Sequence, residues 1–264
     1  MTPPQRSKAA VGAVPEVQPA RSRAEPSLAR LGLLPLAAFV IVVARYGFGA
    51  SFTLAMAAGA PLVLLFAVAP VLAARSRRRF ERGLGMALAR GQGGELEALL
   101  RAARAFRWFG SPGEVAEKEG LVASEAGDHA RAKEAYARAA EGWRGPAPMA
   151  VELGFAHACF ELGEDAKAVT SYRRVLAWEP TMRLARERIA QALLRAGLDG
   201  EGEAHGWLEG LEEAADEEAA HRFRMLRAAA ARSAGEKGEA KRWLKKAGKP
   251  RDEEARALRA LARD

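Results

Sequence analysis

The sequence has few of the residues from which disulfide frameworks and metal sites are built. Cys159 is the only cysteine among 264 residues, so no intramolecular disulfide can form, and this usage fits a reducing compartment. The histidines are His129, His157, His205 and His221, and no two of them form a His-Glu-x-x-His pair. The composition therefore gives no support to a metal site.

Motifs for nucleotide binding and hydrolysis are also missing. The glycines between Gly91 and Gly94 lack the Gly-Lys-Ser/Thr ending of a phosphate loop, and no strand is expected before them. His157, Cys159 and Glu161 are close in sequence, but on a helix Cys159 points away from the other two. We therefore expect Cys159 to be a small, buried apolar residue and not a metal ligand. We predict a protein that is not an enzyme, with no catalytic residue, no cofactor and no metal.

An excess of basic charge is absent from most of the chain, although the net charge is +8. The excess lies before Leu31, at Arg45 and between Arg75 and Arg82, whereas basic and acidic residues are equal in number from Gly83 onward. A nucleic-acid-binding domain would carry the excess on its folded surface. We therefore expect no nucleic-acid partner and interpret the charge as a sign of membrane topology.

Long apolar runs occur in one block only, residues 29–74. Its second run, Phe52 to Ala74, carries no charge and meets alone the length of about 20 residues that a spanning helix needs. Its first run ends at Ala44 and is too short to span by itself. A spanning helix would also have to include Tyr46 to Phe48, with the Arg45 side chain reaching the headgroups. The sequence predicts a two-helix transmembrane hairpin in an all-α protein.

Basic residues flank both ends of this block, and its turn carries only Arg45. Positive charge is retained in the cytoplasm, so we expect both termini on the cytoplasmic side of a membrane such as a bacterial inner membrane. Two alternatives stay open. One is a single span from Phe52 to Ala74, with the first run in the interface, and the other is a buried helical pair in a globular core.

Two further expectations concern this region and the segment before it. Ser51, Ala55 and Gly59 recur at four-residue spacing, which would let the hairpin close tightly or let a second copy pack against it as a homo-oligomer. The proline-rich stretch 1–28 has no periodic apolar face, and we expect a disordered basic tail whose arginines contact anionic lipid.

The remainder of the chain contains an internal period. Gly127-Asp128 is followed by Ala132, Tyr136 and Ala139, and 36 residues later Gly163-Glu164 is followed by Ala168, Tyr172 and Val175. Gly120 and Ala156 lie seven positions upstream of the two glycines, weaker copies surround Gly197 and Gly235, and a degenerate first copy starts near Phe80. This pattern resembles the tetratricopeptide repeat (TPR), an antiparallel helix pair of about 34 residues.

The resemblance implies an α-solenoid in which small residues sit at helix contacts, glycine supplies a left-handed helix end, and tyrosine fills the gap to the next pair. Glu119 departs from the leucine usual in the family. The predicted organisation is a tail (1–28), a transmembrane hairpin (29–74), a basic juxtamembrane segment with a degenerate repeat (75–112), TPR-like repeats (113–254) and the end of a capping helix (255–264).

In this family the first helices line a concave binding surface. The candidate groove residues are Glu117, Lys118, Leu121, Glu125, Leu153, His157, Phe160, Glu161, Glu187, Arg188, Gln191 and Arg195. The family's carboxylate clamp of Lys and Asn is missing, since its positions hold Glu117, Leu121 and Leu153. Phe160 is interpreted either as a solvent-facing anchor for a helix or apolar peptide, or as a residue packed against the next repeat.

We therefore expect a membrane-anchored scaffold that recruits a protein partner to the bilayer, gaining effective concentration from confinement. The alternative is an accessory subunit of a membrane-embedded enzyme or transport complex, in which the hairpin itself contacts the partner. A detached repeat domain should keep its partner in the first case and lose it in the second.

Overall fold

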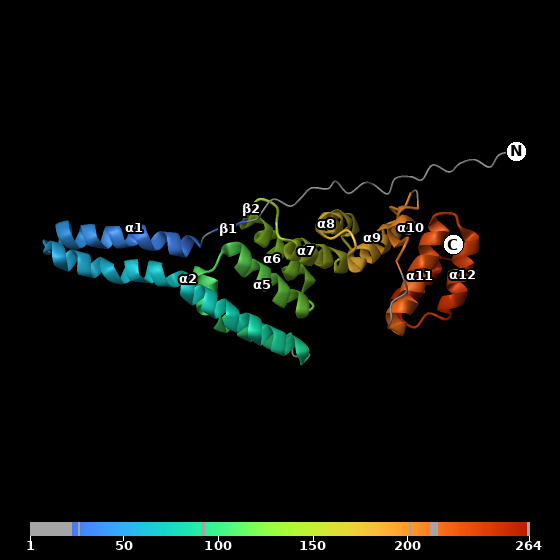
Figure 1. The fold of residues 1–264 in the computed structure, drawn as a ribbon, viewed down its shortest axis with the longest axis horizontal. Helices are drawn as coiled ribbons and strands as arrows, with labels where there is room; N and C mark the ends of the chain where they lie inside the picture. Colours follow the sequence, from blue (N-terminus) through green and yellow to red (C-terminus); the bar gives the residue numbers. More distant parts are fainter. Residues whose placement is uncertain (1–22, 26, 91–92, 201, 212–215, 263–264) are drawn as a thin grey trace. The chain divides into compact units, whose positions relative to one another are not determined.

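The computed structural model describes residues 23–25, 27–90, 93–200, 202–211 and 216–262, and over these ranges the protein is all-α apart from one short pair of strands (Figure 1). The chain divides into two compact units, an N-terminal unit ending at Gly154 and a C-terminal unit beginning at Phe155. Each unit is described by itself below. The all-α prediction is confirmed.

The N-terminal unit begins with a helical hairpin. Helix α1 spans Leu28–Val42 and continues as a π-helical turn over Val43–Gly47, and helix α2 spans Phe52–Ala89. Among the described helices, only α2 is long and apolar enough to cross a membrane, whereas Leu31–Gly47 is a shorter apolar helix. Arg45 lies within the π-helical turn, and its Nη1 donates to the carbonyl oxygen of Ala50 at 2.9 Å.

Small residues hold the two hairpin helices together. Ala37 and Ala55 are buried, and Gly59 is so close to α1 that a Cβ there would lie 2.5 Å from Cγ1 of Ile41. Small side chains at such a contact allow the two backbones to approach each other closely. The four-residue spacing of small residues therefore closes the hairpin within one chain.

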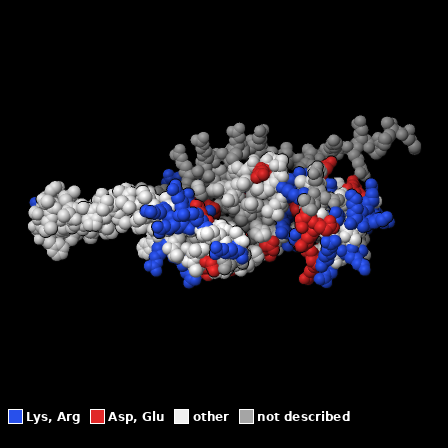
Figure 2. Space-filling view, turned by 60° about the horizontal axis from the view of Figure 1, so that its bottom comes forward, with Lys and Arg blue, Asp and Glu red and all other residues white. Residues whose placement is uncertain are grey.

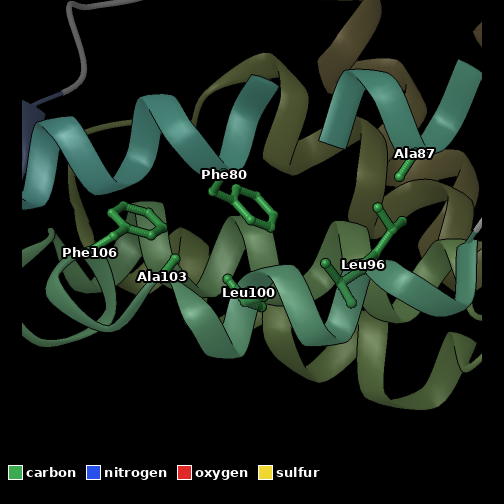
Figure 3. Packing of buried hydrophobic residues seen from close by; sticks show 7 residues of the cluster. Phe80, Ala87, Leu96, Leu100, Ala103 and Phe106 are labelled. Atoms are coloured by element: carbon green, nitrogen blue, oxygen red, sulfur yellow. The ribbon is translucent and has the colours of Figure 1, made fainter. Parts of the chain in front are cut away.

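Beyond its apolar run, α2 joins a hydrophobic core with helix α3 (Leu96–Ala102) and helix α4 (Arg104–Phe109). Figure 3 shows this cluster, which includes Phe80, Ala87, Leu96, Leu100, Ala103 and Phe106. The buried apolar residues of α3 and α4 share this core with α2. The segment forms two short helices, because the backbone of Ala103 leaves the helical conformation between them.

Helices α5 (Pro112–Glu125) and α6 (His129–Glu141) form a packed pair in this unit. A Cβ on Gly120 would lie 3.0 Å from ring atoms of Tyr136, and one on Gly154 would overlap the same ring. Both glycines therefore make room for Tyr136, as expected for a tyrosine that fills the gap to the next pair. The unusual Glu119 forms an ion pair with Arg138 at 2.8 Å.

The segment before α1 is bound to this helix pair. Strand β1 (Arg23–Ala24) pairs antiparallel with strand β2 (Trp143–Arg144), and the amide of Glu25 donates to the carbonyl oxygen of Gly142 at 3.1 Å. The prediction of a disordered tail over 1–28 is wrong for these strand residues, because backbone pairing with β2 orders them. Residues 1–22 of that tail lie outside the described residues.

The C-terminal unit continues the succession of helices. Helix α7 (Met149–Glu161) begins in the N-terminal unit and is followed by α8 (Asp165–Trp178), α9 (Arg183–Arg195), α10 (Glu203–Leu208), α11 (Glu217–Ser233), α12 (Lys237–Ala247) and α13 (Glu253–Leu261). Helix α8 packs on α9, and α11 packs on both α12 and α13. The weaker copy around Gly197 is followed by the short helix α10.

Four helices end in the same kind of glycine turn. Gly127, Gly163, Gly197 and Gly235 have φ values of 75°, 74°, 64° and 80°, and they follow α5, α7, α9 and α11. After each glycine, the next amide donates to the carbonyl oxygen five residues earlier in the chain, at 2.8 to 2.9 Å. This is the Schellman motif. The predicted left-handed helix ends are confirmed at all four positions.

Candidate functional site

The predicted groove residues lie on three helices. Glu117, Lys118, Leu121 and Glu125 are on α5, Leu153, His157, Phe160 and Glu161 are on α7, and Glu187, Arg188, Gln191 and Arg195 are on α9. The first five belong to the N-terminal unit and the other seven to the C-terminal unit. We therefore describe two separate faces, one in each unit.

Phe160 is the centre of the face in the C-terminal unit, but it is only 2% exposed. The guanidinium carbon of Arg188 lies 4.4 Å from the ring centroid, and that of Arg195 lies 4.3 Å from it. Cations over an aromatic face are attracted by the ring quadrupole. The interpretation of Phe160 as a solvent-facing anchor is wrong, because two arginines of α9 cover its ring, and the alternative of a packed residue is confirmed.

Arg195 fixes α9 against the turn between α7 and α8. Its Nε donates to both carboxylate oxygens of Asp165, at 3.0 and 2.9 Å, and its Nη2 donates to the carbonyl oxygen of Phe160 at 2.6 Å. Asp165 is buried at the start of α8, and a buried carboxylate is tolerated when it is paired in this way. The predicted groove residue Arg195 thus serves the packing of the helices.

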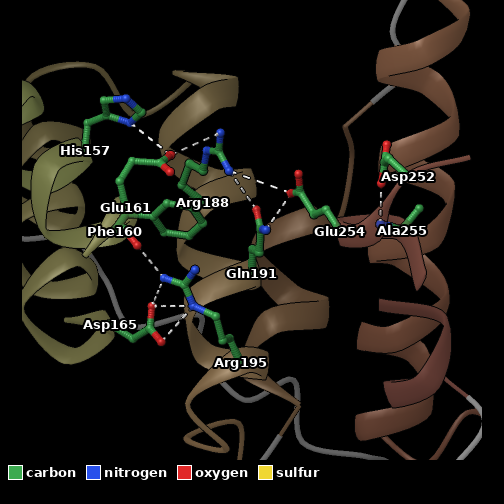
Figure 4. Close-up of polar contacts among 10 residues, drawn as sticks. All are labelled: His157, Phe160, Glu161, Asp165, Arg188, Gln191, Arg195, Asp252, Glu254 and Ala255. Carbon is green, nitrogen blue, oxygen red and sulfur yellow. Dashed lines mark hydrogen bonds and ion pairs between the residues drawn. The ribbon is translucent and has the colours of Figure 1, made fainter. Parts of the chain in front are cut away.

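The other polar residues of this face form a chain of contacts (Figure 4). His157 Nδ1 lies 3.8 Å from Oε1 of Glu161, and the same oxygen lies 4.0 Å from Nη2 of Arg188. Arg188 Nη1 donates to Oε1 of Gln191 at 3.0 Å. All four residues retain some solvent exposure, so a partner could reach them.

A carboxylate from the chain itself already binds this face. Gln191 Nε2 donates to Oε1 of Glu254 at 2.6 Å, and Arg188 Nη1 lies 3.8 Å from the same oxygen. Glu254 is in the first turn of α13, a helix capped by Asp252, whose Oδ1 accepts from the amide of Ala255 at 2.6 Å. Arg188 and Gln191 therefore form a site that holds a carboxylate.

The face on α5 is less basic. Glu117 and Lys118 form an ion pair at 2.7 Å, and Leu121 and Leu153 are half-buried. Burial, reinforced by the charges of Glu117 and Glu125, raises the pKa of Tyr136 to about 12. The lysine of this face is already paired with a glutamate. The face on α5 therefore offers an acidic partner fewer contacts than the face on α9.

Glu187, the fourth predicted groove residue of α9, is paired with another residue of the same helix. Arg183 Nε donates to its Oε1 at 2.6 Å, one helical turn away. The candidate carboxylate site on α9 is therefore made by Arg188 and Gln191 without Glu187.

Two features of the C-terminal unit could not be found from sequence. Glu254 lies 63 positions from Gln191, and no motif in either segment signals their contact. His205, Glu236 and Glu239 bring three metal-type ligand atoms within 4.8 Å of one another. Glu239 also accepts from Nε1 of Trp243 at 3.0 Å, so this cluster is part of a hydrogen-bonded network.

Cys159 is buried, as predicted for a small apolar residue at a helix contact.

Comparison of the chain with protein-family models, with curated proteins and with solved structures found no match.

Proposed function

We propose that this protein is a membrane-anchored interaction scaffold, in which the α1–α2 hairpin spans a bilayer and the helices that follow form a TPR-like α-solenoid. The observation that carries the proposal is the surface of the hairpin. Phe39, Leu64 and Val71 are each 65% exposed, while alanines and a glycine fill the contact between the helices. A folded water-soluble protein rarely leaves so much apolar surface uncovered.

Contacts at the base of the hairpin favour two spans rather than one. The segment before α1 pairs with β2, and Oγ of Ser27, the N-cap residue of α1, donates to the carbonyl oxygen of Trp108 at 2.9 Å. After the apolar run of α2, Phe80 packs on α3 and α4. Both ends of the hairpin therefore reach the same group of helices, which supports placing both ends on one side of the membrane.

The repeated helix ends support the solenoid. Besides the four Schellman turns, the small residues expected at helix contacts are buried, namely Gly120, Ala132, Ala156 and Ala168. Ala190, Ala228 and Ala240, in the weaker copies, are buried as well. Alanine or glycine at these positions lets two helices approach closely, so the same local device recurs along the chain. Stacked pairs of this kind present extended binding surfaces.

The site formed by Arg188 and Gln191 supports a partner that carries an acidic residue. Glu254 holds the position of the partner's carboxylate in the free protein, so binding requires that Glu254 be displaced. Arginine and glutamine donors that already bind one carboxylate can bind another with the same geometry. The scaffold thus recruits an acidic segment of a protein to the membrane surface.

The test is affinity purification of the full chain from detergent-solubilised membranes. Glu254→Ala removes the competing carboxylate and should increase the yield of partner, while Glu253→Ala, at an exposed position of the same turn, should leave it unchanged. Equal yields for both variants would reject the carboxylate site. A chain released from membranes by alkaline carbonate would reject the membrane anchor itself.

A further inference from the structure

Arginines gather where the apolar hairpin of the N-terminal unit ends. Arg75, Arg78 and Arg79 follow the charge-free run of α2, and Arg104 and Arg107 lie on α4, which packs against both α1 and α2. We call these five residues, together with Trp108, the basic collar. Figure 2 shows Lys and Arg side chains concentrated where the mostly white, apolar hairpin ends.

The collar arginines are exposed and are not used for internal pairing. Within the described residues, no ion pair joins any of the five to a carboxylate, whereas their neighbour Arg77 is paired with Glu114 at 2.6 Å. Internal salt bridges therefore do not explain this concentration of positive charge. Unpaired arginines at the end of an apolar helix are suited to the phosphates of anionic lipids.

The contacts of Trp108 locate the collar along the axis of the hairpin. Its side chain is 67% exposed, and its carbonyl oxygen accepts from Oγ of Ser27 at the start of α1. Because Gly59 faces Ile41 and Ala37, the antiparallel register places Ser27 within about one helical turn of Ala73 on α2. Trp108 therefore lies at the height where the apolar runs of both helices end, which is where tryptophan anchors proteins in membrane interfaces.

We propose that α4 is an interfacial helix: Trp108 inserts at headgroup depth and the collar arginines bind anionic phospholipid headgroups. This inference rests on the proposed membrane anchor and adds to it a lipid-binding surface outside the spans. The core residue Phe106 holds α4 on α2, so the collar is fixed at the base of the hairpin. Its lipid contact positions the α5–α6 pair at the membrane surface.

The depth of Trp108 can be measured in vesicles of phosphatidylcholine and phosphatidylglycerol that contain the purified full chain and no other protein. Lipids brominated near the headgroup should quench part of the tryptophan fluorescence. Trp108→Phe should abolish this quenching, and Trp178→Phe, in the C-terminal unit, should retain it. A chain that stays in the vesicles with equal quenching in both variants would overturn the interfacial helix but not the membrane anchor.

The charge is tested by lipid selectivity. The full chain, extracted from mixed vesicles and analysed for bound lipid, should be enriched in phosphatidylglycerol over phosphatidylcholine. Arg104→Gln with Arg107→Gln should lower this enrichment, on the order of five-fold for each arginine removed. The control is Arg131→Gln with Arg138→Gln on α6, where both arginines are exposed but paired with glutamates.

Unchanged enrichment in the collar variant would reject lipid binding by these arginines. A collar that binds a protein instead of lipid would leave Trp108 unquenched in the protein-free vesicles, which would also overturn the inference. A chain that does not enter vesicles at all would overturn the membrane anchor together with the collar, so failure of the anchor is distinguishable from failure of the collar alone.

Discussion

The hairpin and the helix pairs use the same small residues beneath opposite surfaces. In both regions alanine and glycine lie at helix contacts, as Ala55 does in α2 and Ala168 in α8, and both side chains are fully buried. The outer face differs, since the hairpin exposes leucine, valine and phenylalanine while the pairs expose arginine, lysine and glutamate. Small residues decide how closely helices pack, and the outer residues decide which solvent surrounds them.

The largest expected difference between the two regions is the stability cost of removing a phenylalanine side chain. Phe160 is buried under Arg188 and Arg195, whereas Phe39 of α1 is exposed. Phe160→Ala should lower the free energy of unfolding by about 3–5 kcal/mol, the usual cost of emptying a core site. Phe39→Ala, the matched control, should change it far less. Thermal melts of the full chain in detergent measure both, and equal shifts would contradict the assignment of Phe160 to the core.

The second largest difference is expected when an arginine replaces an exposed leucine in each region. Leu64→Arg places an arginine near the middle of the apolar run of α2 and should oppose membrane insertion by about 2.5–3.5 kcal/mol. Leu184→Arg, at an exposed leucine of α9, should change stability by no more than about 0.5 kcal/mol. The fraction of chain in the membrane pellet checks the first, and a thermal melt checks the second. A pellet fraction for the Leu64 variant equal to that of the unmodified chain would contradict the placement of this position in the apolar part of a bilayer.

Added bulk tests the contacts that the two regions share. Ala168→Leu overpacks the α8 contact and should lower stability by about 1–3 kcal/mol. Ala166→Leu changes an exposed position on the same helix and should have little effect. Chemical unfolding followed by circular dichroism gives both values. If the Ala168 variant unfolded like the unmodified protein, the repeat register would be wrong.

The smallest effect concerns two buried tyrosines of the pairs. Burial raises the pKa of Tyr136 to about 12 and raises the pKa of Tyr172 as well. Above about pH 10 the unfolded chain loses phenolic protons that the folded chain keeps, so stability should fall as pH rises from about 10 to 12. Chemical unfolding measured across this pH range gives the free energy of unfolding at each pH. Tyr136→Phe with Tyr172→Phe should make its decrease smaller, whereas Tyr46→Phe, at an exposed residue of the hairpin, should leave the decrease unchanged.

Local signals made much of the fold predictable from sequence. The apolar block, the four turn glycines and the small residues around them each specify structure within a few residues of themselves. Helix ends and buried alanines therefore agree with expectation.

The candidate site was less predictable, because long-range contacts determine it. Whether Phe160 faces solvent depends on Arg188 and Arg195, and the occupant of Arg188 and Gln191 is Glu254 of a distant helix. The pairing of β1 with β2 joins segments that are far apart in the sequence, and nothing in the composition of the tail signals it.

The most direct test of the account is the side of the membrane on which the hairpin turn lies. Ser51→Cys in the turn and Ala130→Cys at an exposed position of α6 can each be labelled with a membrane-impermeant maleimide in sealed cells, since the native Cys159 is buried. We predict that position 51 is labelled in sealed cells and that position 130 is labelled only after the membrane is opened. Labelling of both positions in sealed cells, or of neither, would contradict a hairpin that spans the bilayer with its two ends on one side.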